Sequence, residues 1–101
     1  MLAQVKNRIL FRSRYLNVYF VRYPEGHKVV PHVDMIAGGQ LYKLNCVVRQ
    51  PKEGGHFECE RNLFNLFDRI VLFRPDLHRH SVSKIQRGSR WLLSFALNTA
   101  G

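Results

Sequence analysis

Hydrophobic and polar positions alternate along most of this 101-residue chain. A period of two residues is typical of β-strands that have one face in a core. The alternating segments are rich in aromatic and β-branched residues, and turns containing glycine or proline separate them. The pattern therefore predicts roughly seven short strands. They cover residues 15–23, 29–34, 41–49, 56–60, 68–74, 80–86 and 90–97.

Two segments do not follow this pattern. Residues 1–14 are left open, because Leu2, Val5 and Ile9 have helix-like spacing while the letters RILF could begin a strand. Residues 61–67 are interpreted as a helical turn or a loop that buries its large apolar side chains, Leu63, Phe64 and Phe67.

Regular short strands and turns predict a single all-β domain over residues 1–101, with few or no helices. A double-sheet jelly roll, the double-stranded β-helix, is one such form, and it leaves a mouth between its sheets where ligands bind. Three local features follow. Pro31 indicates an edge strand or a bulge. Gly54 and Gly55 indicate a turn with positive φ. Trp91 is expected in the core.

Composition indicates a folded and strongly basic protein. Hydrophobic residues make up 46% of the chain, which argues against disorder. Lysine and arginine total 16 against 7 acidic residues, a net charge of +9. This charge favours anionic partners, namely a nucleic acid, an acidic polypeptide or a small polycarboxylate. The arginines are scattered, however, and a solvated surface is the simpler interpretation for most of them.

Nothing in the sequence indicates export or membrane insertion. No apolar run approaches the ~20 residues of a membrane span, and the first residues lack the features of a secretory signal. Cys46 and Cys59 stand apart without a paired ligand spacing, so reduced thiols are expected. We therefore expect an intracellular, cytoplasmic protein.

The candidate chemistry centres on His32 and Asp34, which share one face of a predicted strand. Such a pair can bind a metal or make a local hydrogen bond. A third candidate, His80, opens a later strand, and Arg90 follows ten residues beyond it, past a turn at Gly88. Two imidazoles and one carboxylate can occupy one face of an octahedral ion, as in non-haem Fe(II) oxygenases.

Three segments carry a family resemblance: VRYPEGHKVVPHVD, YKLNCVVRQPKEGGHFEC and LFRPDLHRHSVSKIQRGSRWLLSFAL. Together they resemble the 2-oxoglutarate- and Fe(II)-dependent oxygenases, and within them the prolyl-4-hydroxylase-like branch. The last segment is similar to the family pattern H-x-V-x-x-V-x-x-G-x-R, read from His80 to Arg90. Counting from His78 fails, because the pattern would then require glycine at Gln86 and arginine at Gly88.

The resemblance implies a residue-by-residue assignment. His32, Asp34 and His80 would bind Fe(II), and Arg90 would pair with the far carboxylate of 2-oxoglutarate. Tyr23 and Lys43 would also hold this co-substrate, with Tyr42 as the alternative to Lys43 and Asn45 at the border of the site. The chain departs from the family in its short length and in having Lys43 where a tyrosine is common.

The implied reaction uses dioxygen and 2-oxoglutarate to hydroxylate a peptidyl, prolyl side chain, with release of succinate and CO2 and with ascorbate as an accessory reductant. Two alternatives remain open. One is an oxygenase acting on a nucleic acid or a small molecule. The other is a protein without catalysis, either a metal-binding jelly roll or a basic β-domain that binds nucleic acid through exposed Tyr15, Tyr19 and Phe20. The oligomeric state is not predicted.

Overall fold

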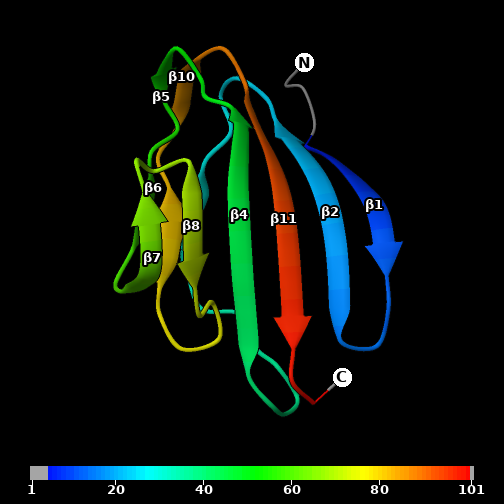
Figure 1. Ribbon diagram of the computed structural model, residues 1–101. Helices are drawn as coiled ribbons and strands as arrows, with labels where there is room; N and C mark the ends of the chain where they lie inside the picture. Colours follow the sequence, from blue (N-terminus) through cyan, green and yellow to red (C-terminus); the bar gives the residue numbers. More distant parts are fainter. Residues whose placement is uncertain (1–4, 101) are drawn as a thin grey trace.

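The computed structural model describes residues 5–100, which form eleven strands and no helix (Figure 1). The same residues therefore contain no helix that could cross a membrane. A six-stranded antiparallel sheet has the spatial order β1 (Lys6–Arg12), β2 (Leu16–Tyr23), β11 (Arg90–Asn98), β4 (Leu41–Arg49), β8 (Ile70–Phe73) and β7 (Asn62–Leu66). The prediction of an all-β chain is confirmed.

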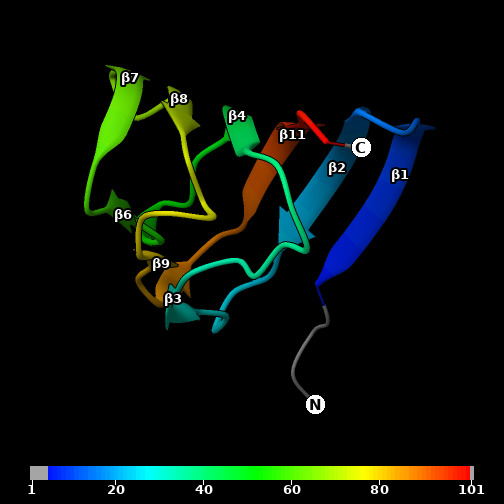
Figure 2. The same cartoon turned by 90° about the horizontal axis from the view of Figure 1, so that it is seen from below.

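A smaller sheet lies over part of one face of the larger one (Figure 2). It has the order β3 (Val29–His32), β9 (His80–Val82) and β6 (Phe57–Cys59). A separate pair consists of β10 (Ile85–Arg87) and β5 (Glu53–Gly54). We call the face of the six-stranded sheet that is turned toward the smaller sheet its inner face, and the opposite one its outer face.

Alternation along each strand decides which residues form the core. Val21 on β2, Leu92 on β11 and Val47 on β4 are buried on the inner face, with Val71 and Phe73 on β8. Val82 and Ile85 are buried opposite them. Each of these side chains contributes roughly 1.5–3 kcal/mol through the apolar surface that it removes from water.

The prediction for residues 61–67 is wrong. They form the edge strand β7, followed by a turn in which Phe67 and Asp68 both have positive φ. The large apolar side chains are not buried, since Leu63 is 55% exposed, Phe64 50% and Phe67 85%. Phe64 lies on the outer face of this edge strand, which no layer of described residues covers, and Phe67 lies in the turn after it.

Smaller corrections concern element ends. The segment 29–34 is a strand only to His32, and 80–86 is divided into β9 and β10. Residues 6–12 form a strand, so Ile9 lies in a strand and not in a helix. Leu2 lies outside the described residues. Trp91 is half-buried on the outer face and not in the core.

Other local expectations are confirmed. Pro31 lies on β3, an edge strand whose pairing with β9 has an irregular register. Gly54 and Gly55 have φ values of 74° and 68°. The two cysteines are free thiols.

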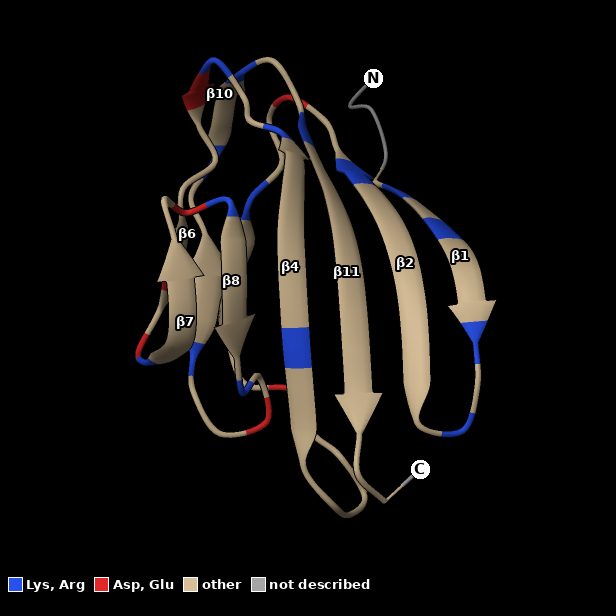
Figure 3. Ribbon diagram, in the orientation of Figure 1, with Lys and Arg blue, Asp and Glu red and all other residues tan. Residues whose placement is uncertain are grey.

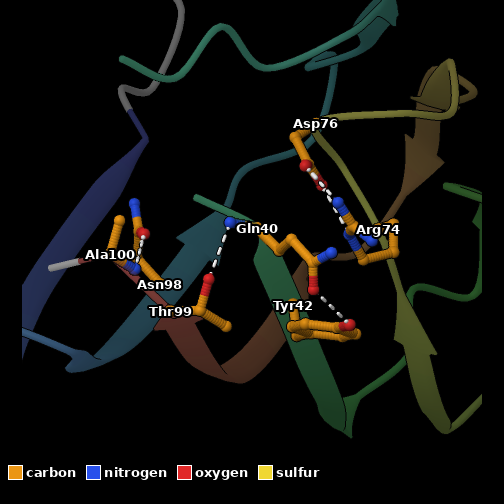
Figure 4. Close-up of polar contacts among 7 residues, drawn as sticks. All are labelled: Gln40, Tyr42, Arg74, Asp76, Asn98, Thr99 and Ala100. Carbon is orange, nitrogen blue, oxygen red and sulfur yellow. Dashed lines mark hydrogen bonds and ion pairs between the residues drawn. The ribbon is translucent and has the colours of Figure 1, made fainter. Parts of the chain in front are cut away.

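The end of β11 is tied to the loop before β4, because the amide of Gln40 donates to Thr99 Oγ1 at 2.9 Å and the amide of Thr99 donates to the carbonyl of Gln40 (Figure 4).

Candidate metal centre

Three side chains predicted to bind a metal come together at the smaller sheet. His32 ends β3 and His80 begins β9, and the two residues are direct cross-strand partners. Asp34 lies in the loop just beyond β3, where its amide donates to the carbonyl of Pro75 at 2.8 Å. The shared strand face predicted for His32 and Asp34 is therefore replaced by a strand end and a loop anchored to a second loop.

The ligand atoms of these residues have spacings that suit one ion. Asp34 Oδ1 lies 3.2 Å from His32 Nε2 and 3.7 Å from His80 Nε2. One ligand atom from each of the three residues lies within 4.8 Å of the other two. Bonds of about 2.1 Å at right angles separate two ligands by about 3 Å, so small adjustments would let all three reach one divalent cation.

Backbone hydrogen bonds set the orientation of both imidazoles. His32 Nδ1 donates to the carbonyl of Val30 at 2.7 Å, and His80 Nδ1 donates to the carbonyl of His78 at 3.1 Å. A carbonyl can only accept, so each ring carries its proton on Nδ1 and presents Nε2 to Asp34. This is the arrangement that holds histidine in the tautomer needed for metal binding.

Burial strengthens the case for a cation here. His80 is 7% exposed, and its burial lowers the pKa of the imidazole below its ordinary value. The neutral ring then directs the lone pair of Nε2 toward a carboxylate oxygen, which is also an electron-pair donor. Two such donors at close range repel each other unless a cation lies between them, so the residues fit a bound divalent metal.

Two cationic side chains, the buried Arg90 and the half-buried Lys43, lie near this cluster. Arg90 is 4% exposed and is the cross-strand partner of Tyr23. Burial lowers the pKa of Arg90 and that of Lys43, while the Asp34 charge raises the pKa of Lys43. Burial also raises the pKa of the Tyr23 hydroxyl. Within residues 5–100, neither cation makes an ion pair, so the site offers two positive charges to an anionic ligand.

A cavity of about 420 Å³ opens on the inner face of the six-stranded sheet, beside Asp34 of the cluster. Tyr23, Asp34, Lys43 and Ser94 line its inner part. Arg90 does not line this cavity but borders a separate hollow of about 240 Å³, on the side of Gly55 and Phe57. Lys43 and Tyr42 are neighbours on β4 and therefore point to opposite faces. Tyr42 does not line the cavity, and its hydroxyl donates to Gln40 on the outer face (Figure 4).

Sequence reasoning missed part of the site. Ser94 lines the cavity and donates to the side chain of Asn45 at 2.7 Å, so Asn45 lies one contact behind the cavity wall. Alternation along β11 could have identified Ser94, because it is in phase with Arg90. The carbonyls that orient the histidines carry no signal in side-chain patterns, and only the folded backbone reveals them.

Comparisons with known proteins identify a family and a fold. The model of the 2OG-Fe(II) oxygenase superfamily matches residues 18–98 of the chain. No curated protein matches the chain. His32, Asp34, His80 and Arg90 all lie inside the matched range.

Two solved structures are similar in fold. The cupin domain of Schizosaccharomyces pombe Cnp3 has a TM-score of 0.60 at 15% identity, covering 99% of this chain and 65% of that chain. A chain from the Rhodobacter sphaeroides complex of SigE with the anti-sigma ChrR has a TM-score of 0.54 at 21% identity, covering 93% of this chain and 45% of that chain. These identities are evidence for the fold alone. The two similar structures confirm the prediction of a double-stranded β-helix.

Proposed function

The chain belongs to the 2OG-Fe(II) oxygenase superfamily, and from that membership we propose that it is a 2-oxoglutarate-dependent dioxygenase that hydroxylates a peptidyl side chain, with proline as the preferred residue. In this proposal His32, Asp34 and His80 hold Fe(II). Arg90, Lys43 and Tyr23 hold 2-oxoglutarate, and ascorbate serves as an accessory reductant. The observation that carries the proposal is the approach of two oriented imidazoles to one carboxylate oxygen, at 3.2 and 3.7 Å.

Each residue has a definite task. Iron, when bound, supplies the oxidative chemistry that couples decarboxylation of 2-oxoglutarate to hydroxylation. The carbonyls of Val30 and His78 keep the imidazoles in the metal-binding tautomer. Lys43 lines the cavity and Arg90 is the cross-strand partner of Tyr23, which also lines it. Neither positive charge has a carboxylate partner among residues 5–100, so the two attract a dicarboxylate. The Tyr23 hydroxyl keeps its proton and can donate to the same carboxylate.

The outer part of the cavity supports a neutral, amide-rich substrate. Its lining includes Asn7, Asn17, Tyr19 and Asn98, which offer hydrogen-bond donors and acceptors without charge. Apart from Asp34 and Lys43, no charged side chain lines the cavity within the described chain. Phosphate groups would find no further basic partner there, which favours a peptide over a nucleic acid.

The test is an anaerobic Fe(II) titration followed by measurement of succinate released from 2-oxoglutarate. His32→Ala should abolish turnover, while Arg90→Ala should mainly raise the concentration of 2-oxoglutarate required. His56→Ala is the matched control, since this histidine is exposed and is not one of the three grouped ligand residues. Wild-type behaviour of both His32→Ala and Arg90→Ala would contradict the site assignment.

One second candidate shares the geometry: a jelly-roll protein that binds a metal without turnover. This candidate predicts that Fe(II) binding saturates and depends on His32. It also predicts that the protein releases no more succinate than a reaction mixture without protein. Prolyl specificity is tested separately, with proline-containing peptides and matched peptides in which alanine replaces proline.

A further inference from the structure

Arg90 borders a hollow that is separate from the cavity proposed for the co-substrate. This hollow has a volume of about 240 Å³, whereas the cavity of about 420 Å³ is lined by Lys43 and Asp34 and not by Arg90. We call it the rear hollow, and its lining includes Arg90, Val47, Gln50, Pro51, Phe57 and Asp68. A ligand in the rear hollow can therefore reach Arg90 without entering the cavity.

Arg90 is a buried charge without a carboxylate partner in the described part of the chain. The residue is 4% exposed, and it makes no ion pair within residues 5–100. The six strands of the main sheet contain no aspartate or glutamate, and acidic residues lie only in the connections and the small sheets (Figure 3). Burying a guanidinium is unfavourable unless an anion compensates its charge. The rear hollow therefore presents half of an ion pair, and the planar fork of the arginine fits a carboxylate.

The other lining residues select the size and charge of the ligand. Val47, Pro51 and Phe57 offer apolar surface, and the side-chain amide of Gln50 offers a hydrogen-bond donor. Asp68 lines the same hollow and makes no ion pair within residues 5–100. Its negative charge repels a second carboxylate on the ligand. The rear hollow therefore fits a molecule that has one carboxylate and a short uncharged body.

We propose that the rear hollow binds a small monocarboxylate through Arg90, and that this binding weakens the affinity of the cavity for 2-oxoglutarate. The coupling between the two ligands is electrostatic. Burial is the main cause that lowers the pKa of Lys43, and the Arg90 charge lowers it further, so the field of Arg90 reaches the cavity. A carboxylate in the rear hollow neutralises part of this field, and each ligand then lowers the affinity for the other by the same factor. The coupling rests on the proposed function, whereas monocarboxylate binding does not.

The first experiment titrates butyrate into the full chain at constant ionic strength, without iron or 2-oxoglutarate. One arginine Nε–H signal in the NMR spectrum should change in a saturable way, and Arg90→Gln should remove this change. Succinate has a second carboxylate where butyrate has a methyl group, and it should bind at least about threefold more weakly because of Asp68. This comparison uses Lys43→Met protein, so that the cavity lacks its cation for succinate.

A pair of exposed glutamines keeps the test decisive if Arg90→Gln does not fold. Gln50→Glu places a negative charge in the lining of the rear hollow and should weaken butyrate binding by about fivefold or more. Gln40→Glu adds the same charge at an exposed position that lines neither space, and it should keep the affinity within about twofold. Lys43→Met should also keep the butyrate affinity within about twofold, because Lys43 lines only the cavity.

Three results would overturn the monocarboxylate site. They are the lack of saturable butyrate binding, an affinity for succinate that equals or exceeds that for butyrate, and a loss of butyrate affinity in Lys43→Met or Gln40→Glu as large as in Gln50→Glu.

A second experiment tests the coupling by anaerobic titration of the Fe(II)-loaded protein with 2-oxoglutarate. Saturating butyrate should raise the apparent Kd of 2-oxoglutarate by about fivefold or more, which lies within the usual range of coupling between sites. An unchanged Kd would overturn the coupling. If 2-oxoglutarate does not bind even without butyrate, the proposed function fails, and the butyrate titration still decides whether the rear hollow is a monocarboxylate site.

Discussion

His32 and His80 are direct partners across the pairing of β3 with β9, and their ring centroids lie 4.3 Å apart. This single register brings together two residues that are distant in the sequence. A slip of one residue would turn one imidazole to the opposite face of the sheet. The anchored loop of Asp34 then adds the carboxylate. The metal site therefore depends on one strand pairing and one loop contact.

Metal binding should stabilise the fold. At a free Mn(II) concentration about 100-fold above its Kd, linkage adds about 2.7 kcal/mol to the free energy of unfolding. For a domain of this size, that gain raises Tm by an amount of the order of 10 °C. Asp34→Ala should remove the increase, whereas His56→Ala should retain it, and calorimetry with and without Mn(II) measures both. An equal Tm increase in Asp34→Ala would contradict the assignment of Asp34 as a ligand.

Lys43 and Tyr42 provide a matched test of the co-substrate site. Lys43→Met should weaken 2-oxoglutarate binding by about 10- to 100-fold, because a charge-assisted hydrogen bond contributes about 1.5–3 kcal/mol. Tyr42→Phe removes only the hydrogen bond to Gln40 on the outer face and should leave this affinity unchanged. Anaerobic titration of the Fe(II)-loaded protein gives both constants. The opposite ranking of the two variants would assign Tyr42 to the site instead.

Two glycines should respond differently to the same substitution. Gly54 has a φ of 74°, and a Cβ there would collide with the carbonyl oxygen of Lys84. Gly54→Ala should lower the free energy of unfolding by at least about 1–2 kcal/mol, the strain of a left-handed conformation. Gly38 has no heavy atom near its Cβ position, so Gly38→Ala should be neutral or stabilise by up to about 1 kcal/mol. Urea unfolding measures both variants, and equal effects would contradict the turn geometry.

Acid stability should depend on the ion pair between Asp76 and Arg74. Hydrogen bonds from Arg74 at 2.9 and 2.6 Å hold the pKa of the Asp76 carboxyl below its usual value (Figure 4). The unfolded chain therefore takes up this proton at higher pH than the folded chain. The contribution is complete above the ordinary aspartate pKa of about 3.9 and is lost as the pH falls through the lower folded-state value.

Asp76→Asn should accordingly lower stability at neutral pH and reduce the loss of stability over this acid range. Arg74→Met should have the same effect on the acid range, because it removes the partner that lowers the pKa. Urea unfolding at several pH values measures these profiles. An unchanged acid profile in both variants would show that other carboxylates control acid unfolding.

Much of the fold and of the site was predictable from local patterns. Alternation and turn residues located most strands, and the H-x-D pattern with a histidine ten residues before an arginine singled out three residues whose candidate ligand atoms come together. These signals are local in origin, since alternation, glycine and proline act on the backbone within a few residues. The chemical types of the candidate ligands are likewise written directly in the chain.

The sequence by itself determined the strand pattern, the basic charge and the residue types available for metal binding. Only the tertiary structure decided which face of each strand is covered, which is why Trp91 and Phe64 are not in the core. It also decided that Lys43 and not Tyr42 lines the cavity, and that two backbone carbonyls orient the histidines. A period of two residues separates the two faces of a strand, but it cannot tell which of them another layer will cover.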